Sequence, residues 1–398
     1  MQSGVRITGI GIVSATGLSA EENLASLTGS KTGIGLARHL PGHEGLLAGE
    51  VKASNDKLKA MLALNTAYVS RTSLLGMLAA REAWGSHRHN PELRTGLIAA
   101  TSVGGMDRSE LFYKNLVSGS EPDYALLKTH DSGSTTEKIA DYLGIRGYVT
   151  TLSTACSSGA NAIMLGARMI RQGKLDRVLV GGSDALTSFT VNGFRSLMIY
   201  DEQWCRPFDE SRSGLNLGEG AAFLLLENEK SISFSGAKTL ALVTGWANAA
   251  DAYHQTASSP EGTGATLAIG QAIARSGVPL SGISYVNAHG TGTKNNDLSE
   301  SVALKNIFGD AVPAFSSTKP FTGHTLAAAG AIEAVFCVQA IASQLVYPSL
   351  NFQNPIEEAG LKPVAELQKG VKVDAVLSNS FGFGGNNSSL VFSAPAEQ

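Results

Sequence analysis

Residues 148–160 read YVTTLSTACSSGA, and this stretch does most to decide the fold. The run Tyr148–Ser153 predicts a buried strand, the small residues after it predict a sharp turn, and Ser157–Arg171 has the pattern of a helix. Cys156 then lies at the start of the helix, where free N–H groups and the helix dipole favour a thiolate and can hold an oxyanion. A small buried cysteine in front of a helix would give the same pattern, so this stretch alone leaves both interpretations open.

The same alternation of short strands and helices continues along the chain, which is typical of an α/β protein. We expect further strands at Val5–Ile12, Thr95–Thr101, Arg177–Gly182, Ala221–Glu227, Leu240–Gly245, Ile283–Asn287, Ala314–Ser316, Asp374–Ser380 and Ser388–Ser393. We expect further helices at Glu21–Leu27, Leu58–Trp84, Ser134–Leu143, Gly264–Ser276, Asp297–Phe308 and Gly323–Ala342. Because Ile7-Thr8-Gly9 and Val243-Thr244-Gly245 open the pattern twice, we predict two related halves, 1–239 and 240–398, in one compact body.

Composition removes several classes of protein. The 398 residues include 45 glycines, only 16% charged side chains and a net charge of −3, which excludes disorder, collagen and coiled coil and gives no electrostatic footprint for nucleic acid. Three cysteines without a CxxC spacing argue against a disulfide framework and a zinc site, and predict a cytoplasmic protein. The apolar stretch Leu326–Ala342 contains Glu333 and is too short to span a bilayer. The N-terminal VRITGIGIVSATG fits a strand and loop better than a signal peptide.

Two further segments carry histidine at the ends of expected strands. NAHGTGT places His289 directly after a strand, and STKPFTGHTLAAAG places Lys319 and His324 between a strand and a helix. A single histidine is more often a core residue than a catalytic one, but both segments share the small-residue strand exit that precedes Cys156. Since ligands bind at the carboxyl ends of strands in open α/β sheets, we predict that these side chains meet in one site.

The segment NSFGFGGNNSS, residues 379–389, alternates phenylalanine and glycine between the last two expected strands. Glycine lets a backbone approach another group closely, so Phe381–Gly384 predicts a tight turn whose N–H groups face a partner. A plain glycine hairpin is the alternative.

Taken together and in this order, these four segments resemble the elongating β-ketoacyl-acyl-carrier-protein synthases, the condensing-enzyme branch of the thiolase fold. The resemblance runs from Val5 to Phe392. It implies a five-layered αβαβα architecture built from two pseudo-repeated halves, and a dimer. It also implies a 3-oxoacyl synthase that condenses malonyl carrier protein with an enzyme-bound acyl chain, using no cofactor beyond the phosphopantetheine of the acyl carrier protein.

The resemblance assigns the catalytic set to Cys156, His289 and His324, with Lys319 as the supporting residue. Cys156 would take the acyl chain as a thioester, and the two histidines would stabilise the enolate that decarboxylation leaves. The resemblance thus places the nucleophilic cysteine in the N-terminal half and the two histidines in the C-terminal half.

The resemblance further assigns an oxyanion hole to the backbone N–H groups of Cys156 and Phe383. Phe383 would also gate the acyl pocket, with Phe381 supporting it. Thr291 and Thr293 would hold the phosphopantetheine arm.

Glu333 resembles a family glutamate that lies near the lysine. It would either pair with Lys319 or help to hold a structural cation together with Asn287 and the backbone of Ser378 and Asn379. We favour the ion pair, and we expect no other metal site.

Three departures from the family pattern bear on the substrate and the partner. The usual Pro-x-Gly-Asp after the first histidine is replaced by Lys294-Asn295-Asn296-Asp297, and Gly104–Glu137, which borders the family's acyl pocket and dimer interface, looks different. The segment GLNLGEG, residues 214–220, resembles synthases of bacterial pigment clusters of the aryl polyene type. The partner is therefore either a second copy or a chain-length-factor-like homologue.

The surface that binds the carrier protein is less defined. The basic candidates are Lys57, Lys59, Arg71 and Arg206. Two other functions stay open at this point: an acyl hydrolase or acyltransferase that uses Cys156 with one histidine, and a non-catalytic partner subunit. A chain-length factor would have lost the cysteine, which this chain keeps.

Overall fold

The computed structural model describes residues 4–40, 42–86 and 90–395. Ten of its strands are joined by hydrogen bonds in one continuous sequence of neighbours. The order is β10-β9-β13-β14-β8-β1-β7-β6-β4-β5. These strands are β1 (Val5–Val13), β4 (Thr95–Ala100), β5 (Tyr148–Leu152), β6 (Arg177–Asp184), β7 (Gly220–Glu227), β8 (Ala241–Ala250), β9 (Tyr285–Asn287), β10 (Ala314–Ser316), β13 (Ala375–Gly382) and β14 (Asn386–Ser393). Two small ribbons lie outside this order, β2 (Gly35–Leu36) with β3 (Leu47–Ala48) and β11 (Leu345–Val346) with β12 (Gln368–Lys369).

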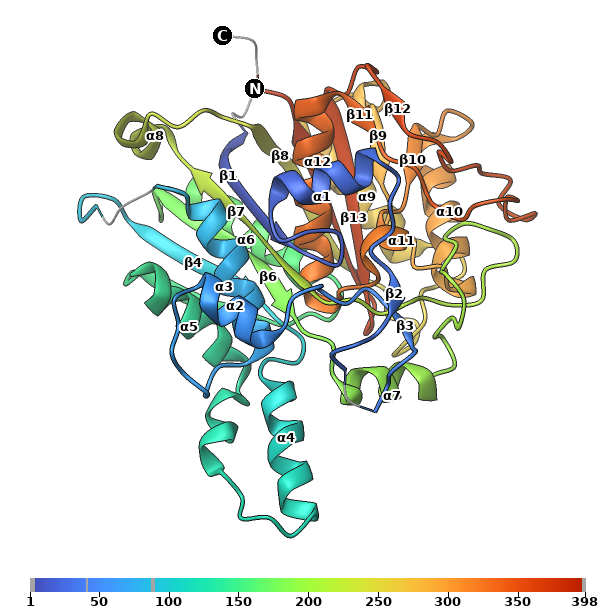
Figure 1. The fold of residues 1–398 in the computed structure, drawn as a ribbon. Helices are drawn as coiled ribbons and strands as arrows, with labels where there is room; N and C mark the ends of the chain where they lie inside the picture. The colour runs from blue at the N-terminus through green and yellow to red at the C-terminus, as the bar shows by residue number, and fades with distance from the viewer. Residues whose placement is uncertain (1–3, 41, 87–89, 396–398) are drawn as a thin grey trace.

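Helices cover and separate the two halves of this order (Figure 1). They are α1 (Ala20–Thr28), α2 (Asn55–Met61), α3 (Arg71–Trp84), α4 (Met106–Val117), α5 (Ser132–Leu143), α6 (Ser158–Arg171), α7 (Ser188–Ser196), α8 (Glu229–Ser235), α9 (Thr263–Ser276), α10 (Lys294–Phe308), α11 (Lys319–Thr322) and α12 (Ala329–Ser343). Three 3₁₀ turns join them, η1 (Tyr124–Thr129), η2 (Leu280–Gly282) and η3 (Leu326–Ala328).

The layers follow from which helices touch which strands. Helices α3 and α5 pack on the N-terminal strands and α9 packs on the C-terminal ones, with α10 against α9. Helices α6 and α12 each contact strands of both halves and one another, so they form the middle layer. Their apolar side chains and those of the flanking strands make up the largest buried cluster. The predicted αβαβα arrangement of five layers is therefore confirmed.

The two halves repeat one strand order. Read outward from β1, the N-terminal half runs β1-β7-β6-β4-β5, and read outward from β8, the C-terminal half runs β8-β14-β13-β9-β10. If the five main strands of each half are numbered by their order in the sequence, both halves place them side by side in the order first, fifth, fourth, second, third. The halves join where β1 pairs antiparallel with β8, from Val5 opposite Val243 to Ile7 opposite Ala241.

Packing explains why the Thr-Gly pair occurs both at residues 8–9 and at residues 244–245. A Cβ atom on Gly9 of β1 would lie 2.1 Å from the carbonyl oxygen of Ala83 on α3. A Cβ atom on Gly245 of β8 would lie 2.2 Å from the carbonyl oxygen of Ala272 on α9. Glycine at both positions lets an outer helix rest directly on the strand backbone, once in each half.

The middle layer depends on two more glycines at the crossing of α6 and α12. A Cβ on Gly159 would lie 2.7 Å from the backbone nitrogen of Ala331, and a Cβ on Gly330 would lie 2.8 Å from that of Ala160. We expect Gly159→Ala to lower the free energy of unfolding by about 1–3 kcal/mol, the usual cost of overpacking a core. Urea unfolding measures it, and Gly193→Ala, which meets no atom within 4 Å, is the matched control. Equal stability of the two variants would contradict this packing.

The segment Leu326–Ser343 is the one part of the described residues that is long and apolar enough to cross a membrane. It is 89% buried inside the protein, between the two halves of the sheet. Its apolar character is therefore that of a core helix. The sequence argument that this stretch is too short to span a bilayer was wrong, and the burial of the helix explains its composition instead.

Two predicted helices are divided in the structure. The stretch predicted as Leu58–Trp84 is α2 and α3, because Ala63 adopts a positive φ of 53° and Ser70 caps the second helix by accepting from the N–H of Ser73. The stretch predicted from Gly323 begins as helix α12 only at Ala329, because the positive φ of Leu326 breaks the run.

Candidate active site

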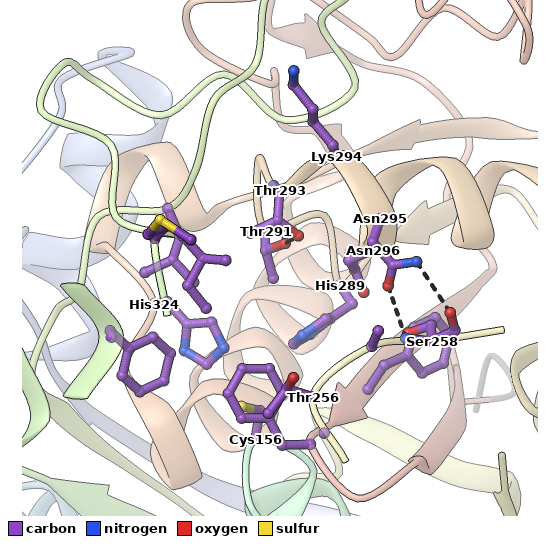
Figure 2. A pocket seen from close by; sticks show the side chains of 18 of the residues that line it. Cys156, Thr256, Ser258, His289, Thr291, Thr293, Lys294, Asn295, Asn296 and His324 are labelled. Carbon is purple, nitrogen blue, oxygen red and sulfur yellow. Dashed lines mark hydrogen bonds between the residues drawn. The ribbon is translucent and has the colours of Figure 1, made fainter. Parts of the chain in front are cut away.

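Cys156 lies in a sharp turn between β5 and α6. The preceding Ala155 has a φ of +51°, a left-handed conformation that costs free energy in a residue other than glycine. Serine side chains hold the turn: Ser158 Oγ accepts from the N–H of Thr154 at 2.7 Å, and Ser157 Oγ donates to the carbonyl of Thr154 at 2.7 Å. The cysteine is 6% exposed and faces a cavity (Figure 2).

The turn that joins β13 to β14, residues 382–385, approaches this cysteine. Gly384 and Gly385 adopt φ values of +82° and +78°, which fold the turn back toward Cys156. Burial raises the pKa of the Cys156 thiol to about 11, against the lowering effect of the Lys319 ammonium and of the backbone N–H groups of Phe383 and Cys156. This raised pKa favours the thiol near neutral pH, and the two N–H groups lie close to the sulfur. Their role as the oxyanion donors that the resemblance implies stays a prediction.

Lys319 contacts both Glu333 and His289. Its ammonium lies 2.5 Å from Oε1 of Glu333 and 3.2 Å from Nδ1 of His289, and it also donates to the His289 carbonyl oxygen. Lysine and glutamate are both 2% exposed. The structure therefore brings Glu333 together with Lys319 in the favoured ion pair, and that pair sets the orientation of His289.

The two histidine rings meet at right angles inside the cavity. Their centroids lie 5.5 Å apart with an interplanar angle of 89° (Figure 2). Nδ1 of His324 accepts from the backbone N–H of Leu326 at 3.0 Å, and Nδ1 of His289 faces the lysine ammonium. With Nδ1 used as the acceptor, each neutral ring carries its proton on Nε2, so the site holds two N–H donors.

Both rings are neutral because they are buried beside a cation. Burial and the Lys319 ammonium lower the pKa of His324 to about 3 and that of His289 well below its usual value. Near neutral pH these pKa values favour the neutral form of both rings, with Nε2–H as an uncharged donor.

The lowered pKa of His324 predicts how the free energy of unfolding changes in acid. An unfolded histidine titrates near 6.5, so as the pH falls the unfolded chain binds a proton that folded His324 does not. The folded state should lose about 1.4 kcal/mol per pH unit from this group between roughly pH 5.5 and pH 3.5. His324→Asn, whose Oδ1 can still accept from Leu326, should remove that component. Urea titrations of both proteins over this range measure the difference, and parallel curves would contradict the lowered pKa.

Two carboxylates that the sequence analysis did not assign to the site position the NAHGTGT segment. Glu300 accepts from the N–H groups of His289 and Gly290 at 2.9 and 2.8 Å, and Asp297 accepts from those of Thr291 and Gly292. Both belong to α10, which follows directly. Acidic residues in the first turns of a helix that begins next to a glycine-rich loop were the signal that could have identified them.

A third unassigned carboxylate joins the histidine segment to the N-terminal half. Asp184, at the end of β6, accepts from the N–H of Ala327 at 2.8 Å and from the hydroxyl of Thr101 at 2.6 Å. Burial raises its pKa to about 6, against these hydrogen bonds. Asp184 therefore fixes η3, which follows His324, to the end of β4.

The cavity encloses about 450 Å³. Thr291 and Thr293 line it, with their hydroxyl oxygens 2.8 Å apart (Figure 2). Phe381 and Phe383 line it as well, and Phe383 stacks on Phe194 of α7 with ring centroids 5.7 Å apart. The predicted arm-binding, supporting and gating residues thus share one cavity with the cysteine and the histidines.

The residues named for a structural cation contain unused ligand atoms. No cluster of three or more His, Cys, Asp or Glu side chains suited to a metal ion occurs among the described residues. However, both side-chain polar atoms of Asn287, Oε2 of Glu333 and Oγ of Ser378 are buried without a hydrogen-bond partner. Asn379 is committed to Glu300 and Ser389. Oxygen atoms from Asn287, Glu333 and Ser378 therefore fit a hard cation, whose binding remains a prediction.

The basic candidates for the carrier-protein surface separate into two groups. Arg71 is 7% exposed and makes a two-pronged ion pair with Glu219 at 2.6 and 2.8 Å, so its assignment to the surface was wrong. The physical reason is that Arg71 begins α3 and its guanidinium also donates to the carbonyls of Val51 and Ala53, so the loop that contains them covers it. Lys57 is exposed, and the Arg206 guanidinium, which bonds Gln203 and Ser211, is in part exposed.

The fold and this site define a condensing enzyme of the thiolase type, and comparison with known proteins gives its family. The family model "Beta-ketoacyl synthase, N-terminal domain" matches residues 2–231, and "Beta-ketoacyl synthase, C-terminal domain" matches residues 240–353. This chain therefore belongs to the β-ketoacyl synthase family and is an acyltransferase. The division predicted at residues 239 and 240 stays a prediction, which the repeated strand order supports.

Individual relatives agree with this assignment. The 3-oxoacyl-[acyl-carrier-protein] synthase 2 of Staphylococcus aureus (strain COL) is 35% identical over 367 residues, which cover 87% of each chain. The solved structure of the ishigamide ketosynthase/chain length factor superposes with a TM-score of 0.93 at 29% identity, over 100% of both chains. The ketosynthase ApeO in complex with its chain length factor ApeC, from Xenorhabdus doucetiae, gives a TM-score of 0.85 at 32% identity over 98% of both chains.

Proposed function

We propose that this chain elongates acyl groups on acyl carrier protein, by decarboxylative condensation of malonyl carrier protein with an acyl chain on Cys156. The carrying observation is that one cavity holds a thiol on a helix N-terminus, a backbone donor pair beside it and two neutral histidine donors. A hydrolase would need a base to activate water, and the two lowered histidine pKa values argue for donors placed to stabilise an enolate.

In the first half-reaction, Cys156 Sγ attacks the carbonyl carbon of the acyl thioester. The new Sγ–C bond forms as the bond to the phosphopantetheine sulfur breaks, and the thiol proton leaves with that sulfur. The N–H groups of Cys156 and Phe383 stabilise the oxyanion between these two events. Thr291 and Thr293 hold the arm from one wall of the cavity.

In the second half-reaction, a malonyl thioester occupies the same arm site. Its carbonyl oxygen accepts from Nε2–H of His289 and His324, so the bond to the carboxylate breaks, carbon dioxide leaves and an enolate remains. The enolate carbon attacks the acyl-cysteine carbonyl, the new carbon–carbon bond forms and the Cys156 sulfur leaves as a thiolate that takes up one proton. The product is a 3-oxoacyl thioester two carbons longer.

The partner in this proposal is either a second copy or a chain-length-factor-like homologue. A projecting arm, α4 with η1, extends away from the body (Figure 1) and exposes Tyr113, Val117 and Tyr124 at 65–69%. Edge strand β5 lies at one end of the sheet order. The match to ketosynthase/chain-length-factor structures supports a heterodimer, in which this chain is the catalytic subunit because it keeps Cys156. The aryl polyene type pathway in this proposal rests on the resemblance of residues 214–220. The proposal includes a cytoplasmic location, which three free cysteines support.

Intact-mass analysis tests the function directly. The purified protein is incubated with acyl carrier proteins that bear different chains, and then with malonyl carrier protein. We expect an acyl adduct that disappears as a 3-oxoacyl carrier protein forms. Release of free acid without condensation would instead identify a hydrolase. If no adduct forms, the assay is repeated with a co-expressed chain-length-factor-like homologue, and failure there would overturn the proposal.

A further inference from the structure

A loop at the cavity mouth lies between the 382–385 turn and helix α10. This mouth loop, residues 251–259, follows β8, and its Thr256, Ala257 and Ser258 line the cavity. Its two ends are buried and residues 252–256 are exposed. The far end is fixed at Ser259, whose N–H bonds the Asp251 carboxylate at 2.7 Å and whose carbonyl accepts from Ser299 at 2.7 Å.

Residues 252–258 of this loop have two attachments to other elements. Among the hydrogen bonds of the described residues, one runs from the N–H of Gly384 to the carbonyl of Gln255 at 2.8 Å. The other is a clamp in which Asn295 Oδ1 accepts from the N–H of Ser258 at 2.8 Å, and Asn295 Nδ2 donates to the carbonyl of Ser258 at 3.1 Å (Figure 2). One amide side chain thus satisfies both backbone groups of one residue, as a neighbouring strand would.

We propose that Asn295 is a positioning residue, which acts through the mouth loop to hold the oxyanion N–H of Phe383 in place. This inference rests on the proposed function for its catalytic consequence. The chain of contacts is short: Asn295 fixes Ser258, two residues (Thr256 and Ala257) lead back to Gln255, and Gln255 holds Gly384, which is next to Phe383.

The mouth loop also bonds this turn from its near end, where the N–H of Asp251 donates to the carbonyl of Gly385 at 2.7 Å, so the bond to Gln255 is what holds the Gly384 side of the turn. Gly384 and Gly385 both have positive φ values, and glycine gives the most freely moving backbone of any residue. An N–H donor lowers a barrier only if it is already aimed at the position where the oxyanion forms. Asn295 occupies the variable position of the pattern Pro-x-Gly-Asp, between the two departures Lys294 and Asn296.

Amide hydrogen exchange of the intact protein tests the positioning without any substrate. We expect Asn295→Ala to raise exchange by about tenfold in peptides covering 252–258 and 382–385, since two exposed hydrogen bonds are lost. Asn295→Asp keeps an oxygen for the N–H of Ser258 and loses the donor, so its exchange should lie between those of the alanine variant and the parent. Asn306→Ala is the matched control, because the side chain of that exposed α10 asparagine bonds Glu261 and Thr266 at the start of α9, away from the mouth loop.

Acyl transfer supplies the second readout. Asn295→Ala should lower kcat for Cys156 acylation by about three- to tenfold, because a donor that is misaimed costs less than one that is removed, while KM changes less. Unchanged exchange at 382–385 in Asn295→Ala, or an equal rise in Asn306→Ala, would overturn the proposal. If the parent protein accepts no acyl donor, the proposed function fails, and the exchange comparison still decides the positioning role.

Discussion

Cys156→Ala should abolish condensation, by about 10³-fold or more, because no acyl thioester can form without the sulfur. Cys156→Gln should also fail to condense, yet it should decarboxylate malonyl carrier protein at the parent rate or faster. The reason is geometric: the glutamine carbonyl can occupy the donor pair at Cys156 and Phe383 as an acyl-cysteine would. His289 and His324 remain in place to stabilise the enolate.

Release of labelled carbon dioxide and formation of 3-oxoacyl product are measured in parallel for the parent and both variants. Thermal unfolding of each variant checks that the site is still folded. Condensation at the parent rate by either variant would remove the cysteine from the mechanism. Normal output from a complex that contains Cys156→Ala in this chain would instead identify it as the non-catalytic subunit.

Lys319→Met should be the most destabilising change at the site, at about 3–5 kcal/mol, because it leaves the Glu333 carboxylate buried without its partner. Glu333→Gln should cost a similar amount by leaving the ammonium unpaired. The double variant should recover most of the loss, since it buries no charge. Urea unfolding of the four proteins forms a double-mutant cycle, and additive losses would contradict the ion pair.

The same cycle separates stability from catalysis. In the double variant no ammonium faces Nδ1 of His289, so the proton is no longer confined to Nε2. Malonyl decarboxylation should therefore stay low when folding has recovered. Parallel recovery of both quantities would show that Lys319 acts only by supporting the fold.

The sequence alone predicted those parts of the site whose structure depends on residues close together in the chain. The strand, turn and helix around Cys156 follow from residue types within one short stretch, and each histidine lies directly after its own strand. The glycine echo at Gly9 and Gly245 indicated the duplication because the same backbone contact recurs in each half. Such features depend on neighbours in the chain, which periodicity and turn chemistry report.

The features that sequence reasoning missed depend on distant partners. Glu300 binds the backbone of the His289 segment across a loop, and Asp184 binds Ala327 from a strand in the other half. Arg71 looked like a surface charge until the fold placed Glu219 beside it. No pattern within a window of the chain encodes these encounters, because they arise only after tertiary packing.

The repeated strand order places the proposed catalytic groups at corresponding positions in the two halves. Strands β5 and β10 hold the same place in their halves, and each leads through a connection into a middle-layer helix, α6 or α12. In the first half that connection is a short bend that bears the nucleophile. In the second half it is longer and bears Lys319 and His324. The corresponding corner of the two halves therefore bears the cysteine in one half and the lysine with the second histidine in the other, and both corners open into one cavity.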